Sequence, residues 1–334
     1  MACAVVAEAV VDTEDAVDRG REDDVQYSLK LGLQQPARAD ASDAVAAALW
    51  EPTDIQAWAV LILNTADPER KVALTRRGAA LWQAGQLASP PPRFSQESDC
   101  RHAREPTPDR PARADGMMVA GPHEMKIGKG GTAASRVAIL HSLANIEQFA
   151  IDLAWDIIAR FGEAPLADGK VLPRGFFDDF VRVAVDEAHH YELLSGRLRA
   201  LGSAFGALPV HHGLWQSAGE TAADLKARLA VVHMVHEARG LDVTPQTIER
   251  LRRNGDPTSA DMLQIIYEEE IGHVTAGMTW FRHVTAAESP GVDPIRLFHE
   301  VVRAHFRGPL KPPFNDAARA QAGFTPEWYL PLAA

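Results

Sequence analysis

Two short motifs each place a carboxylate and an imidazole three residues apart. They read DEAHH over residues 186–190 and EEEIGH over residues 268–273. Residues three apart on an α-helix lie on the same face. Each pair, Glu187 with His190 and Glu270 with His273, can therefore direct a carboxylate and an imidazole toward the same bound ion. Carboxylate oxygen and imidazole nitrogen together suit a divalent metal ion.

The position of each pair within its helix separates a metal site from an ordinary solvated face. A Glu-x-x-His pair alone is a weak signal, because such pairs are usually exposed. Here both pairs interrupt an apolar stripe of helical period, formed by Phe180, Val183, Leu194, Leu198 and Leu201 around the first and by Leu263, Ile266, Gly277 and Trp280 around the second. We therefore expect both pairs to be buried, which favours the metal site.

Two single glutamates complete the expected ligand set. Glu147 is the only acid in the apolar stripe of a first helix, and Glu237 is chosen partly by elimination as the only acid in the second half of a third. Of the histidines beside Glu237, we expect His236 to be exposed and His233 at most to support a ligand. Two single glutamates and two Glu-x-x-His pairs are the ligand inventory of ferritin-like di-iron and di-manganese bundles; the set is Glu147, Glu187, His190, Glu237, Glu270 and His273.

Electrostatics point to two cations at these residues. Four buried carboxylates without partners would each cost several kcal/mol, whereas two divalent ions carry +4 against their −4. Oxygen donors with two imidazoles and no thiolate favour two iron ions, with manganese as the alternative. The remaining N–H of each ligating imidazole needs an acceptor, and we expect Asp186 and Glu269 to reach the histidine of the opposite helix.

Long helices must position these ligands, and the sequence from Ala133 to Phe306 contains them with no competing strand pattern. We predict an all-α fold, a ferritin-like four-helix bundle with a small N-terminal helical extension and an irregular C-terminal tail. Its four helices are expected near Ala133–Phe161, Phe176–Leu201, Thr221–Arg239 and Pro257–Thr285, with short helices near Pro245–Arg253 and Pro294–Phe306.

Composition along the chain divides it into five parts. The predicted parts are a variable extension (1–44), a helical hairpin started by Asp54 and Asp67 (45–88), a Pro-rich linker (89–132), the di-metal bundle (133–306) and a surface tail (307–334). Seven prolines between Ser89 and Pro122 identify the linker.

Charge and cysteine content exclude several classes of protein. The 334 residues carry a net charge of −11, which disfavours nucleic acid as a partner, including tRNA. No apolar run reaches the roughly 18 residues of a membrane span, so no membrane partner is expected. Cys3 and Cys100 are the only cysteines, and the acidic N-terminus does not read as a signal peptide, so we expect a cytoplasmic protein.

At these residues the chain resembles the bacterial ferritin-like proteins grouped as domain of unknown function 455 (DUF455). The resemblance extends from about Val45 to Phe324 and is carried by DEAHHYELLSGRLRALG (186–202), LPVHHGLW (208–215), EARGLDVTP (237–245), EEIGH (269–273) and GPLKPPFN (308–315). It implies a ferritin-like bundle and the same six ligands, and it supplies no reaction. The sequence is more distantly similar to tRNA-modifying di-iron hydroxylases; a basic patch near Arg228, Arg250, Arg252 and Arg253 would be needed for such a partner.

Three functional hypotheses remain open. The chain is expected to be an O2-dependent oxidoreductase or hydroxylase acting on an unknown small molecule with an unknown reductant, in which Glu237 or Glu147 shifts its coordination to open a site. The alternatives are a ferroxidase or metal-storage protein and a non-catalytic metal-binding structural bundle. Tyr191 and Tyr267 are expected to pack rather than to carry redox chemistry. His211 and His212 belong to a loop that either lines an entrance or forms a turn.

Overall fold

The computed structural model describes residues 52–89, 105–121, 124–125 and 127–334, and within them the fold is all-helical. Only three isolated β-bridges interrupt the helices and loops of these residues. The helices are α4 (Ile55–Leu63), α5 (Pro68–Gln83), α6 (Ala133–Phe161), α7 (Arg174–Ala200), α8 (Gly213–Glu220), α9 (Leu225–Ala227), the π-helix η3 (Arg228–His236), α10 (Glu237–Arg253), α11 (Pro257–Glu288), α12 (Pro294–His305), α13 (Asp316–Gln321), α14 (Pro326–Tyr329) and the 3-10 helix η4 (Leu330–Leu332).

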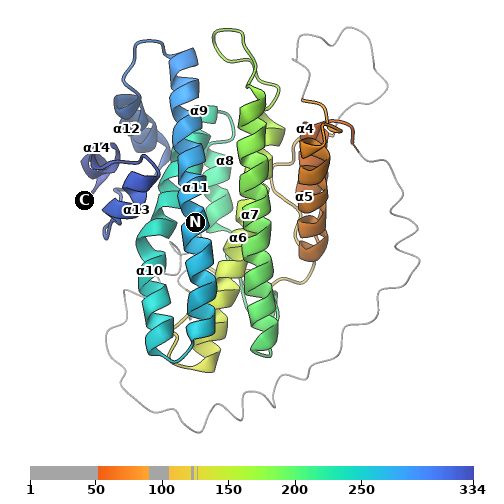
Figure 1. Cartoon of the computed structure of the whole chain (residues 1–334), viewed down its shortest axis with the longest axis vertical. Coiled ribbons are helices and arrows are strands. Elements are labelled where there is room, and N and C mark those ends of the chain that lie inside the picture. The colour runs from red at the N-terminus through yellow and green to blue at the C-terminus, as the bar shows by residue number, and fades with distance from the viewer. Residues whose placement is uncertain (1–51, 90–104, 122–123, 126) are drawn as a thin grey trace.

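Four long helical segments pack along one another and enclose most of the core (Figure 1). α6 lies against α7, α11 lies against α7, and η3 with α10 lies against α11. The α4–α5 hairpin covers this group from outside, with α4 against α6 and α5 against α7. None of the described helices is long and apolar enough to cross a membrane.

The expected starts of several helices are confirmed by their caps. Asp54 accepts hydrogen bonds from the backbone N–H groups of Gln56 and Ala57, and Asp67 caps α5 ahead of Pro68. α6 has the predicted bounds, Ala133–Phe161, and Thr132 caps it. Side chains that accept the first free N–H groups of a helix fix where it begins, which is why these starts can be predicted from sequence.

The third long segment differs from the prediction of two helices, Thr221–Arg239 and Pro245–Arg253. Helix continues from Leu225 to Arg253 through the nine-residue π-helix η3, and Pro245 lies inside α10. Proline lacks an N–H, so the carbonyl of Leu241, four residues earlier, loses its helical donor. The side chain of Asn315 donates to that carbonyl from 3.1 Å, which allows the helix to pass Pro245.

The predicted surface tail, residues 307–334, contributes to the core and needs correction. Phe324, Trp328 and Tyr329 are each at most 1% exposed, and Phe298 of α12 packs edge-on against Trp328. The tail forms the short helices α13, α14 and η4. Trp328 of α14 packs against Phe281 of α11 and Phe298 of α12. The surface position was predicted from the proline content alone. That prediction did not consider the aromatic residues Phe324, Trp328 and Tyr329, which anchor the tail in the core.

Buried ion pairs join α6 to its neighbours on the side away from the metal ligands. Asp152 pairs with Lys71 of α5 and, at 2.6 Å, with Arg113. Asp156 pairs with Arg228 of η3. The described part of the predicted linker is therefore held against α6 by Arg113; the extension 1–44 and residues 90–104 of the linker lie outside the described residues.

Candidate metal centre

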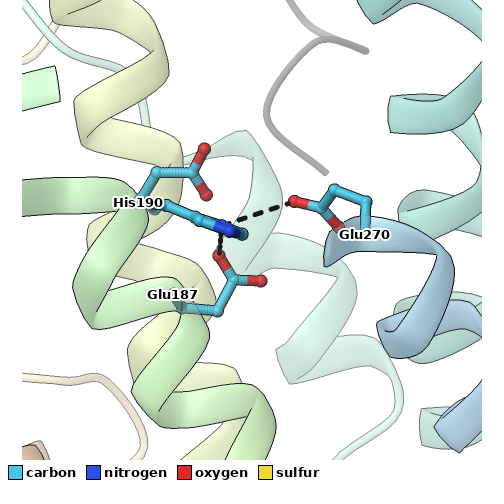
Figure 2. A group of neighbouring side chains, drawn as sticks. Glu187, His190 and Glu270 are labelled. Atoms are coloured by element: carbon cyan, nitrogen blue, oxygen red, sulfur yellow. Dashed lines mark hydrogen bonds and ion pairs between the residues drawn. The ribbon is translucent and has the colours of Figure 1, made fainter. Parts of the chain in front are cut away.

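The six predicted ligands meet in the middle of the long helices. Glu147 comes from α6, Glu187 and His190 from α7, Glu237 from the first residue of α10, and Glu270 and His273 from α11. Each is at most 2% exposed. Figure 2 shows Glu187 and His190 of α7 pointing toward Glu270 of α11.

The ligand atoms divide into two groups of four. Atoms of Glu147, Glu187, His190 and Glu270 all lie within 4.8 Å of one another, and so do atoms of Glu187, Glu237, Glu270 and His273. Glu187 and Glu270 occur in both groups. Each group has three carboxylates and one imidazole, the donor set that suits iron or manganese. Two carboxylates shared between two such groups can bridge two ions.

Both histidines turn the same nitrogen toward the carboxylates. The Nδ1 of His190 lies 3.2 Å from Glu187 Oε2 and 3.8 Å from Glu270 Oε1. The Nδ1 of His273 lies 3.2 Å from an oxygen of Glu187 and 3.2 Å from one of Glu270. Nδ1 is therefore the ligand atom available in each ring.

The outer nitrogens confirm the predicted crossing between helices. His190 Nε2, on α7, lies 2.8 Å from Glu269 Oε2 on α11. His273 Nε2, on α11, lies 3.3 Å from Asp186 Oδ2 on α7. With the proton on Nε2, each ring donates to a carboxylate and leaves Nδ1 for a cation. The residue directly before each shared glutamate, Asp186 or Glu269, thus fixes the imidazole of the opposite helix.

Raised pKa values favour protons on several side chains of this site when no cation is bound. Burial and the carboxylates of Glu187 and Glu270 raise the pKa of Glu147 well above its usual range. Burial raises the pKa of Glu237 to about 8. Burial alone would lower the pKa of His190, but the carboxylates of Glu187, Glu269 and Glu270 raise it to about 9.

The pKa values of His273 and Glu187 also depend on the balance between burial and neighbouring charges. Burial alone would lower the pKa of His273, yet Glu270 and Glu187 raise it well above its ordinary value. The imidazoles of His273 and His190 hold the pKa of Glu187 well below its usual range although burial opposes this. Protons on both imidazoles and on Glu147 and Glu237 would offset the charges of Glu187 and Glu270, and two divalent cations could take the place of those four protons.

Glu147 provides a direct test of whether a cation fits. Its carboxylate is fully buried, and no hydrogen-bond donor among the described residues reaches either oxygen. A buried carboxylate without donors is unfavourable unless it is protonated or binds a cation. The residues present therefore fit a dinuclear metal centre.

The π-helix η3 ends at His236, one residue before Glu237, and lies unusually close to α11. A Cβ added at Gly277 of α11 would come 2.0 Å from the carbonyl oxygen of His233. π-helical turns are often found at functional sites. The absence of a side chain at Gly277 lets the two backbones approach and brings Glu237 to the ligand group.

Of the two histidines beside Glu237, His233 lies near that glutamate, where it could support a ligand, and His236 differs from the expectation. His233 is 2% exposed, with Nδ1 4.0 Å from Glu237 Oε1 and its ring edge-on to Phe180. The expectation that His236 is exposed is wrong: its Nε2 lies 2.9 Å from Ser217 Oγ and its ring contacts Phe306. Packing of α8 and of residue 306 on this face was not visible in the local sequence.

Other candidates take structural positions. Tyr191 packs edge-on against Phe205, and the hydroxyl of Tyr267 accepts from Asn315. Nδ1 of His211 accepts a hydrogen bond from the backbone N–H of Gly213, as expected if this loop forms a turn. The ring of His212 contacts Phe149.

The basic patch considered for a nucleic-acid partner needs correction. Arg228 is fully buried and ion-paired with Asp156, so it offers no surface charge. Arg252 lies 3.0 Å from Asp261, and Arg253 lies 3.7 Å from Glu249. Arg228, Arg252 and Arg253 thus have acidic partners, which weakens the case for a phosphate-binding surface.

Comparison with known proteins gives a family without an activity. Residues 64–330 match the family described as "Protein of unknown function (DUF455)". An uncharacterized protein of Haemophilus influenzae is 35% identical over 211 residues, which cover 62% of this chain and 71% of that protein. No solved structure matches the chain.

Proposed function

We propose that this chain, which belongs to the DUF455 family, is a ferritin-like four-helix bundle with a di-iron or di-manganese centre and acts as an O2-dependent oxidoreductase. One observation carries the proposal: two ligand groups, each of three carboxylates and one imidazole, share Glu187 and Glu270. Two single glutamates and two Glu-x-x-His pairs are the ligands of di-metal carboxylate bundles.

Some residues of the centre would hold the metal ions in place, and others could move to open a position for O2. Iron or manganese ions bound there would supply the electrons that reduce O2 as a C–H bond or heteroatom of an organic substrate is oxidised, with an external reductant to restore them. Asp186 and Glu269 fix the imidazoles of His273 and His190. Glu147 and Glu237 each belong to one group only, so either can shift without releasing a bridge.

Metal analysis tests the site. We expect about two transition-metal ions per chain in protein purified without chelator, and sharply reduced content in Glu187→Ala and His273→Ala. Glu268→Ala is the matched control, because this exposed neighbour of the motif belongs to neither ligand group. Unchanged metal content in both ligand variants would refute the assignment.

Reaction with O2 tests the activity. Stopped-flow mixing of the ferrous protein with O2 should give an absorbing oxidised species within seconds to minutes. Glu237→Ala should lose this reactivity while retaining part of the metal. A metal-loaded wild-type protein that does not oxidise would instead be a non-catalytic structural bundle.

A further inference from the structure

A pocket of about 260 Å3 lies apart from the six metal ligands, between the junction of η3 with α10 and residues 306–319. Val235 and His236 line it from η3, and Phe306 and Phe314 line it from the opposite wall. None of the six ligands is among its lining residues. Its volume is near the lower end of ligand pockets, which start at roughly 300 Å3, and suits a molecule of about one ring with a substituent.

The pocket is lined by positive side chains in an acidic chain. Acids outside the lining pair with three of these side chains: Glu220 with Arg307, and Asp242 with Arg239 and Arg319. Four of its ten lining residues are Arg239, Arg307, Lys311 and Arg319, and none is acidic. The chain as a whole has a net charge of −11. The lining itself contains positive side chains and no acid, which favours anions over cations as ligands.

Arg319 is the buried member of this cationic set. It is 3% exposed, and its Nε and Nη2 donate to Asp242 at 2.8 and 2.6 Å. Its third nitrogen, Nη1, is buried without an acceptor among the described residues. The Cζ of Arg319 lies 5.0, 5.2 and 4.4 Å from the ring centroids of Phe314, Phe324 and Tyr329. Nη1 can still donate a charge-assisted hydrogen bond to an oxyanion.

The wall formed by residues 308–315 is fixed in place before any ligand binds. Arg239 Nη1 donates to the carbonyls of Lys311 and Pro313 at 2.9 and 3.2 Å. The backbone N–H of Asn315 donates to Asp242 at 2.9 Å, and that of Leu310 donates to Leu332 at 2.8 Å. A wall already ordered reduces the entropy lost on binding.

We propose that this pocket binds a small organic anion, with a carboxylate or phosphate group among its arginine and lysine side chains and an apolar or aromatic body against Phe306 and Phe314. The cations supply charge-assisted hydrogen bonds, and the two rings supply apolar contact. This site does not depend on the proposed function, since none of its lining residues is a metal ligand.

Isothermal titration calorimetry tests the proposal. Phenyl phosphate, benzoate and inorganic phosphate are each titrated into the full-length, chelator-treated protein. Phenyl phosphate or benzoate should bind at least tenfold more tightly than inorganic phosphate, and the tighter of the two identifies the anionic group. Absence of binding by both organic anions at millimolar concentration would overturn the proposal. So would equal affinity for inorganic phosphate, because the apolar wall would then contribute nothing.

Substitutions of pocket residues test whether the organic anion binds in this pocket. Lys311→Gln and Arg307→Gln change exposed side chains, and each should weaken the organic anion at least fivefold with an unchanged melting temperature. Arg296→Gln is the control, since this exposed arginine of α12 pairs with Glu300 outside the pocket. Wild-type affinity in both pocket variants would overturn the assignment.

Discussion

Protons and metal ions compete for the same atoms at the residue scale. In the metal-free centre the pKa of His190 is about 9 and that of Glu237 about 8, while those of Glu147 and His273 are raised well above their usual values. These raised pKa values favour the protonated form of all four groups at neutral pH when no cation is bound. Ligands must lose these protons to bind a cation.

We predict that loading two divalent ions at pH 7 releases about four protons per chain, with metal affinity rising from pH 6 to about pH 9. The sign follows from the raised pKa values: lowering the pH keeps more ligands protonated and weakens binding. Calorimetry in buffers of different ionisation enthalpy measures the proton count. Release of fewer than two protons would contradict this protonation pattern.

The grouping of the six candidate ligands was predictable because the motifs coincide with the apolar stripe of each helix. Glu187, His190, Glu270 and His273 share apolar stripes, and the crossing of Asp186 and Glu269 followed from their place beside the bridging glutamates. The sharing of Glu187 and Glu270 between two groups was not predictable, because it depends on how far apart α7 and α11 lie.

At the scale of the element, the close approach of η3 and α11 positions Glu237. We predict that Gly277→Ala destabilises the fold by about 1–3 kcal/mol and weakens metal binding, because its Cβ would collide with the carbonyl of His233. Thermal unfolding and metal titration of the same protein measure both effects.

Gly272→Ala is the matched control on α11. Nothing lies within 4 Å of a Cβ at this position, so alanine should leave stability unchanged or raise it by about 0.5–1 kcal/mol. Equal loss of stability in both variants would mean that helix geometry, rather than the contact with η3, causes the effect.

The continuity of α10 depends on a residue 70 positions later in the chain. Asn315→Ala should destabilise the protein by about 1–3 kcal/mol, because the carbonyl of Leu241 opposite Pro245 would lose its donor. Denaturant unfolding measures the loss. Asn254→Ala, which removes an exposed side-chain bond to Lys129, should cost much less.

η3 and α10 show why the sequence predicted the third long segment less well than it predicted α6. A cap such as Thr132 is local, so the start of α6 can be read from neighbouring residues. The continuation through Pro245 and the π-helix depend on Asn315 and Gly277, which are distant in sequence. Local propensity therefore predicted a break where tertiary contacts supply the missing donor.

At the scale of the whole molecule, the centre joins α6, α7, α10 and α11 through four buried carboxylates and two imidazoles. Bound cations would tie together helices that otherwise meet through like charges and shared protons. A ligand that binds only the folded chain stabilises it by about 2.7 kcal/mol at one hundred times its dissociation constant.

We therefore predict that manganese or ferrous iron at that concentration, filling two sites and so contributing about 5 kcal/mol, raises the melting temperature by roughly 5–10 °C over chelator-treated protein, since each kcal/mol moves a chain of 334 residues by about 1–2 °C. Differential scanning calorimetry under anaerobic conditions measures the shift. Glu187→Gln removes a carboxylate shared by both groups, so its melting temperature should respond little to metal. An equal shift in this variant would mean that the ions stabilise the chain from elsewhere on its acidic surface, and the dinuclear centre would lose its support as the element that holds the four helices together.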